Sequence, residues 1–187
     1  IMNTKDVVIA DNAIILTARS GRAALRHRLE VYDIKVSEEK LDEIYQQFLL
    51  LADKKKELTD DDVLILAGNE RNSQRDIKVE HLQVISGKGT QPMAALTLSI
   101  SGEEFSAATK DNGPVDAAIN AVKQIIRREM VLKEFTIQSI NRGSNDVGKV
   151  HMQVESGGKP YFGFGASTDV VQASVEAFVD CINKFKK

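Results

Sequence analysis

The chain has 187 residues, enough for one domain of ordinary size or two small ones, and 42% of them are hydrophobic, which supplies a packed core. Its 25 basic and 27 acidic residues are interspersed and give a net charge of -2, which argues against nucleic acid or an anionic membrane as a partner. No apolar run approaches the ~20 residues of a membrane span. No signal peptide is recognisable, so we expect a cytoplasmic protein with its single cysteine, Cys181, as a buried thiol.

The first third of the chain has the periodicity of amphipathic helices. One helix is predicted over SGRAALRHRLEVYD, capped by Ser20, and a second follows Ser37 with apolar residues at three- and four-residue spacing. A third begins after a capping box formed by Thr59 and Asp62 and stops at Gly68. We therefore predict a small all-helical subdomain over residues 1–68.

Residues 69–78, NERNSQRDIK, contain almost no apolar side chains and are predicted to be a linker. From residue 79 the hydrophobic period changes from helical to alternating. Strands are expected near 80–86, 94–101 and 104–109, followed by a helix from Pro114 to about Met130. The same order returns, with strands near 132–140, 148–155 and 159–166 and a helix from Asp169 to the C-terminus. Residues 79–187 are thus predicted to be a second domain.

The two halves of this second domain can be aligned. Gly102 with Gly157, Val115 with Val170 and Ala118 with Ala173 are each 55 positions apart. Each half has one apolar sheet face and one apolar helix face, which neither half can bury alone. The predicted fold class is α+β, a small all-helical subdomain followed by a pseudo-twofold pair of βββα units.

Catalytic chemistry is not indicated anywhere in the chain. His27, His81 and His151 are far apart, and none has a carboxylate or a second histidine at a metal-ligand spacing. No nucleophile, base and orienting carboxylate can be assembled from local spacing, and SGKGTQ lacks the Lys-Ser/Thr pair of a phosphate loop. We predict no catalytic residue, no metal site and no cofactor in these 187 residues.

The two strand-to-helix junctions, DNGPVDAAI at 111–119 and ASTDVVQAS at 166–174, are the most informative stretches. Pro114 suits a first helical turn, and Thr168 can cap the second helix with Asp169 in the positive end of its dipole. These features are typical of ordinary helix starts. They also fit a site where free amides hold the carboxylate of a small amino acid while Asp116 or Asp169 meets its ammonium group. The residues alone leave both interpretations open.

At these junctions the chain resembles a known family. DNGPVDAA is similar to the NGPVDA signature of the C-terminal leucine-sensing domain of 2-isopropylmalate synthases, and STDVV resembles the ATDIV-like sequence of its second junction. SGRAALRHRL and LADKKKELTDDD resemble the family's helical subdomain. The resemblance implies an acyltransferase of leucine biosynthesis that condenses acetyl-CoA with 2-oxoisovalerate, is inhibited by leucine and forms a homodimer through its regulatory domain.

The resemblance also implies where each function would lie. The catalytic (β/α)8 barrel, with its divalent metal, would precede residue 1, so this piece is not expected to be active alone. A cluster of basic residues on the first helix is expected either to be solvated or to reach the active site of the partner subunit: Arg22, Arg26, His27 and Arg28. The expected leucine-binding residues are Asn112, Gly113, Pro114, Val115, Asp116, Ala118, Thr168, Asp169, Val170 and Ala173.

Two alternatives remain. A citramalate synthase has the same architecture but uses pyruvate and senses isoleucine, and the substrate pocket that separates the two enzymes would lie in the barrel. The linker motifs favour the isopropylmalate branch. The other alternative is a free-standing amino-acid-binding module unconnected to any enzyme.

Overall fold

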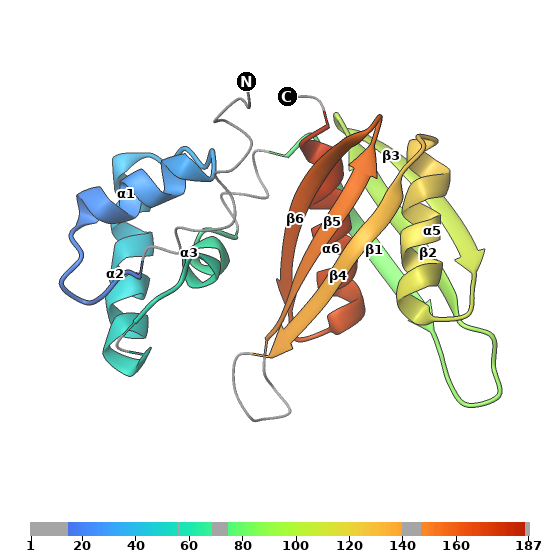
Figure 1. Cartoon of the computed structure of the whole chain (residues 1–187), viewed down its shortest axis with the longest axis horizontal. Coiled ribbons are helices and arrows are strands. Elements are labelled where there is room, and N and C mark those ends of the chain that lie inside the picture. The colour runs from blue at the N-terminus through green and yellow to red at the C-terminus, as the bar shows by residue number, and fades with distance from the viewer. Residues whose placement is uncertain (1–14, 56, 69–74, 140–146, 186–187) are drawn as a thin grey trace, which may run out of the picture. The chain divides into compact units, whose positions relative to one another are not determined.

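The computed structural model describes residues 15–55, 57–68, 75–139 and 147–185. The chain divides into two compact units, which meet in the sequence between Gln74 and Arg75 (Figure 1). The first fourteen residues of the predicted helical subdomain and residues 69–74 of the predicted linker lie outside the described residues. Residues 75–78, which we also expected in the linker, belong to the second unit, whose first strand begins at Ile77.

The described part of the first unit is helical, as predicted. It contains α1 (Arg22–Val31), α2 (Glu38–Lys55) and α3 (Asp60–Leu66). The apolar stripes meet in a core that includes Leu25, Leu29, Leu41, Ile44, Phe48 and Val63. Ser37 caps α2 by accepting the Lys40 amide at 3.3 Å, and the Asp62 carboxylate accepts the Thr59 amide at 3.0 Å. The cap of α1 is Gly21, not the predicted Ser20.

The second unit contains two βββα halves in sequence. The first consists of β1 (Ile77–Ile85), β2 (Met93–Ile100), β3 (Glu103–Lys110) and α5 (Pro114–Ile126). The second consists of β4 (Val131–Ser139), β5 (Gly148–Ser156), β6 (Lys159–Ser167) and α6 (Val170–Asn183). Each half forms a three-stranded antiparallel sheet in sequential order. The predicted fold class is therefore confirmed.

The two halves repeat down to the hydrogen-bond register. The first strand of each sheet has a bulge, between Val79 and His81 in β1 and between Leu132 and Glu134 in β4. The bulge of β1 and the bulge of β4 lie opposite residues of β2 and β5 that occupy the same position in the two halves. The second and third strands of each half are joined by a two-residue turn with positive φ at both residues, Ser101-Gly102 and Gly157-Gly158, which matches the twist of antiparallel strands.

This register corrects the predicted spacing of the repeat. The turn of the first hairpin lies between Ile100 and Glu103, and that of the second lies between Ser156 and Lys159, so corresponding residues are 56 positions apart rather than 55. The helix N-caps, Gly113 and Asp169, are also 56 positions apart. Gly102 therefore corresponds to Gly158, Val115 to Val171 and Ala118 to Ser174. The sequence alignment had placed each of these pairs one position out.

The helices cover the inner faces of the sheets. α5 packs on β2 and β3, α6 packs on β5 and β6, and the two helices contact each other. β5 alternates as its sequence predicts, with Val150, Met152 and Val154 buried on the helix side and His151 on the other face. The predicted buried thiol is also present, since Cys181 is fully buried, and this burial raises its pKa to about 12.

α6 lies unusually close to β6 because two glycines face it. A Cβ atom at Gly163 would stand 2.0 Å from the carbonyl oxygen of Ala177, and one at Gly165 would stand 2.0 Å from that of Ala173. No side chain fits at such distances. The corresponding strand of the first half carries Ala107 and Thr109 instead, and the Thr109 hydroxyl donates to the Ala117 carbonyl at 2.5 Å.

Among the described helices, none combines the length and the apolar character that crossing a membrane would require.

Candidate functional site

Both strand-to-helix junctions lie at one edge of the second unit. In Figure 1, β3 and β6 end and α5 and α6 begin toward the lower edge of this unit. Because the first N–H groups of a helix point out of its N-terminal end, two sets of free amides face the same edge. This arrangement brings the two predicted halves of the site to a common edge.

The start of α5 has no side-chain cap. Its N-cap is Gly113, which has no side chain to accept a hydrogen bond, and Pro114 occupies the first helical position as predicted. The first helical bond runs from the Ala117 amide to the Gly113 carbonyl at 2.9 Å. The amides of Val115 and Asp116 therefore face outward without a cap acceptor, at the positive end of the helix dipole. Such an N-terminus favours an anion.

Two residues that were not predicted hold this junction in shape. Asp111 accepts the Asn112 amide at 2.7 Å and also accepts the side-chain amide of Asn120. The Asp111 amide donates to the Pro92 carbonyl at 3.1 Å, which ties the end of β3 to the start of β2. Asp111 stands beside the motif, but no local sequence pattern indicates that Asn120, two turns into α5, reaches back to it.

The start of α6 is built differently. Asp169 is its N-cap, and Oδ1 accepts the amides of Val171 at 2.7 Å and Gln172 at 3.3 Å. The predicted cap, Thr168, is therefore wrong, since the carboxylate one position later takes the role. As a result the α6 amides are already occupied by a carboxylate of the chain itself, whereas those of α5 are not.

Exposure separates the ten predicted effector residues into two groups. Ala118 and Ala173 are fully buried in the hydrophobic core, so they support the helices and cannot face a guest molecule. The other eight are exposed or partly exposed: Asn112, Gly113, Pro114, Val115, Asp116, Thr168, Asp169 and Val170. Val170 is 37% exposed, a high value for a valine.

Two depressions of the surface lie away from both junctions. One, of about 670 Å³, follows the outer face of β1, β2 and β3 and is lined by small residues such as Ala95, Thr97 and Ser106. The other, of about 410 Å³, lies between β3 and the last turns of α5. Neither lining contains any of the ten predicted effector residues.

The basic residues of α1 do not form one free surface. Arg26 binds Glu38 at 2.6 Å, and Arg22 binds Asp42 at 2.8 Å, so both arginines fasten α1 to α2 at the exposed surface. His27 is exposed. Arg28 is buried and forms a two-pronged ion pair with Asp60 of α3. Arg28 therefore does not belong with the residues predicted to contact a partner's active site.

Tyr32 completes the Arg28 cluster. Its hydroxyl donates to Asp60 Oδ2 at 2.9 Å, and the Arg28 guanidinium lies 5.5 Å from the centre of its ring. Burial and the hydrogen bond to the Asp60 carboxylate raise the pKa of Tyr32 to about 12, and the Asp60 carboxylate also raises the pKa of Arg28. The cluster joins α1 to α3 inside the helical unit.

Within the described ranges, no three histidine, cysteine, aspartate or glutamate side chains gather as metal ligands would.

Residues 57–186 match the LeuA allosteric (dimerisation) domain, a match that includes α3 and nearly the whole second unit. The chain is 57% identical over 186 residues to a 2-isopropylmalate synthase of Parabacteroides distasonis, covering 99% of this chain and 37% of that protein. It is 39% identical to the 2-isopropylmalate synthase of Olsenella uli, covering 98% of this chain and 37% of that one.

A third relative, the 2-isopropylmalate synthase of Aquifex aeolicus, is 37% identical over 98% of this chain and 36% of its own length. The chain thus spans little more than a third of the length of the curated relatives that it matches. The matched domain, the repeated βββα halves and the junction sequences lead to the same result: this chain belongs to the family of the LeuA allosteric (dimerisation) domain.

Proposed function

We propose that this chain is the leucine-sensing, dimer-forming regulatory part of a 2-isopropylmalate synthase. The observation that carries the proposal is the uncapped start of α5, which lies at the same edge as the start of α6 in a domain of an allosteric family. In the complete enzyme, a catalytic barrel with its divalent metal would condense acetyl-CoA with 2-oxoisovalerate to give 2-isopropylmalate. Leucine bound to this part would reduce that activity.

Each chemical group of leucine has a matching feature at the junctions. The leucine carboxylate would accept hydrogen bonds from the outward-facing amides of Val115 and Asp116, where the α5 dipole is positive. The ammonium group would meet the exposed carboxylate of Asp116, because the other acid, Asp169, already caps α6. The aliphatic side chain would contact Val115 and Val170, which are partly exposed valines on the two junctions.

A second copy of the chain would complete this site. The junction residues lie on an open edge, and the two depressions described above do not include them. Most of a small ligand is normally enclosed when it binds with useful affinity. A dimer that places one junction edge against another would exclude water from the leucine side chain, which accounts for dimerisation and effector binding in one domain.

The proposed contact with the active site of the partner subunit is made by three exposed basic residues, Arg22, Arg26 and His27. Arg22 and Arg26 are paired with Asp42 and Glu38 of α2, so the phosphates of CoA would take the place of these carboxylates in binding the two guanidinium groups. Replacing Arg22 and Arg26 by Ala in the complete enzyme should raise the apparent KM for acetyl-CoA. An unchanged KM would remove this part of the proposal.

Calorimetry of the chain with leucine and with isoleucine tests the central proposal. Leucine should bind saturably and more tightly than isoleucine. The variant Asp116→Asn should weaken leucine binding by roughly tenfold, because it removes one charge-assisted contact. Glu103→Gln is the matched control, since Glu103 is an exposed acid at the far end of β3.

Two results would contradict the proposal. Tighter binding of isoleucine would favour the citramalate branch. Equal leucine affinity in the Asp116→Asn and Glu103→Gln variants would show that the effector does not use the α5 junction.

A further inference from the structure

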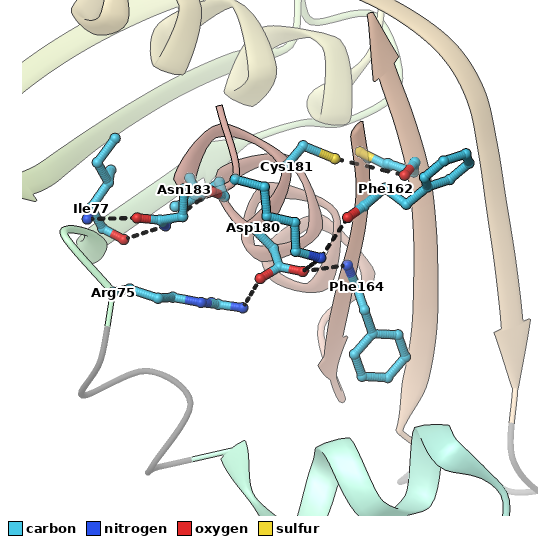
Figure 2. A network of polar contacts seen from close by, with 10 residues as sticks. Arg75, Ile77, Phe162, Phe164, Asp180, Cys181 and Asn183 are labelled. Carbon is cyan, nitrogen blue, oxygen red and sulfur yellow. Dashed lines mark hydrogen bonds and ion pairs between the residues drawn. The ribbon is translucent and has the colours of Figure 1, made fainter. Parts of the chain in front are cut away.

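Asp180, near the C-terminal end of α6, joins three segments of the second unit. Its Oδ1 atom accepts Arg75 at 2.6 Å, and its Oδ2 atom accepts the backbone amide of Phe164 at 3.0 Å and the Lys184 ammonium at 3.1 Å. Figure 2 shows the carboxylate between Arg75 and Phe164. One side chain thus connects α6, β6 and the residue at which the chain enters this unit.

The neighbouring residues strengthen the same connection. The side-chain amide of Asn183 accepts the Ile77 amide at 2.9 Å and donates to the Ile77 carbonyl at 2.9 Å, as a paired strand would (Figure 2). The Lys184 ammonium also donates to the Phe162 carbonyl at 2.6 Å. The last turns of α6 therefore fix both the start of β1 and the middle of β6.

The network is specific to the second half of the repeat. In the register with 56 positions between corresponding residues, Gln124 of α5 takes the place of Asp180, and Gln124 is exposed. By contrast, the side chains of Asp180 and Arg75 are only 8% and 9% exposed. Desolvation offsets much of the attraction in an ion pair buried to this degree, so net stability is not a sufficient reason for the pair.

The Asp180 network is connected to the candidate site through both α6 and β6. β6 runs into the junction that carries Asp169 and Val170, and α6 begins there. Asp180 lies roughly two helical turns beyond Ala173 on the same helix. A shift of α6 against β6 at the junction would therefore alter the Asp180 contacts to Phe164 and to Arg75 together. Arg75 directly follows Gln74, where the two units of the chain meet in the sequence.

We infer that Asp180 is a positioning residue that carries the effect of an amino acid bound at the junctions to Arg75, and through it to the part of the protein that precedes this unit. This inference rests on the proposed leucine-sensing function. It adds a route for the inhibition: the effector acts on β6 and α6, and the Arg75–Asp180 pair passes the change to the chain leading toward the catalytic part. Hydrogen-bond and ion-pair networks of this kind can carry allosteric coupling between two sites.

The test uses the complete enzyme, with Asp180→Asn, Arg75→Met and the control Gln124→Ala. Two quantities are measured for each protein: the leucine Kd, with and without saturating 2-oxoisovalerate and CoA, and the leucine concentration for half inhibition. Asp180→Asn and Arg75→Met should keep the leucine Kd measured without substrate. Their half-inhibition concentration should rise by roughly fivefold or more, and the substrate-dependent change in leucine Kd should become smaller. Gln124→Ala should match the wild type.

Each alternative outcome is decisive. If the wild-type enzyme does not bind leucine, the proposed function fails and the inference fails with it. If the wild type binds leucine and both variants are inhibited like the wild type, the inference alone is overturned. Should Asp180→Asn prove unfolded, Arg75→Met decides, because it leaves the Asp180 contacts to Phe164 and Lys184 in place. A loss of leucine binding in Arg75→Met would indicate a purely structural role and would also overturn the inference.

Discussion

Thr168 and Asp169 are adjacent residues of types that both favour the N-cap of a helix. From the sequence, Thr168 was the predicted cap and Asp169 a first-turn acid. In the structure, Asp169 takes the cap, and its Oδ1 atom binds the Val171 and Gln172 amides. Which of two adjacent residues becomes the N-cap depends on where the preceding strand ends, and that is set by the tertiary structure.

Exchanging each residue for Ala tests this assignment. Asp169→Ala should lower the free energy of unfolding of the second unit by about 1 kcal/mol, because two α6 amides lose their acceptor. Thr168→Ala, an exposed change one position earlier, should stay within about 0.5 kcal/mol of the wild type. Urea unfolding followed by circular dichroism measures both. A larger effect of Thr168→Ala than of Asp169→Ala would restore the original prediction.

At the scale of elements, hydrophobic periodicity predicted most of the second unit. The six strands and two helices occur in the expected order, and β5 buries the face that its alternation indicated. The helix predicted to reach Met130 ends at Ile126, because Arg127 adopts a left-handed conformation with φ 51°. No glycine marks that stop, so the sequence carried no ordinary signal for it.

The candidate site was predicted less completely than the strands. Val115 and Asp116 lie at the junction as expected, but Ala118 turned out to be a core residue. Its burial could have been read from the sequence, because Ala118 shares with Ala121 and Val122 the helical spacing of one apolar face, and that face contacts β2 and β3. The Arg75–Asp180 pair was also missed, because its two residues are 105 positions apart.

The packing of α6 on β6 makes a further prediction at this scale. Gly165→Ala should destabilise the second unit by about 1 to 3 kcal/mol or more, because the added methyl group meets the Ala173 backbone and forces α6 outward. Gly87→Ala is the control, since its Cβ would meet only Thr90 Oγ1, at an ordinary 3.4 Å. It should change stability by no more than about 0.5 kcal/mol. Equal unfolding midpoints for the two variants in urea would refute the close approach of α6.

At the scale of the whole molecule, the chain has two units with different secondary structure. The helical unit contains a hydrophobic core and the Arg28–Asp60–Tyr32 cluster, and the second unit carries the repeated halves and the junction edge. The resemblance seen at DNGPVDAA and STDVV was confirmed by the family match over residues 57–186. The chain covers about 37% of the length of two of its relatives.

The proposed regulation depends most on the binding of a free amino acid at the uncapped start of α5. Amide chemical shifts of the isotopically labelled chain, recorded during a leucine titration, measure this directly. Leucine binding at this position predicts that the Val115 and Asp116 amides show the largest, saturable shifts, while those of Ala95 and Thr97 on the outer face of β2 stay unchanged. Shifts centred on β2, or none at any residue of the α5 junction, would contradict it.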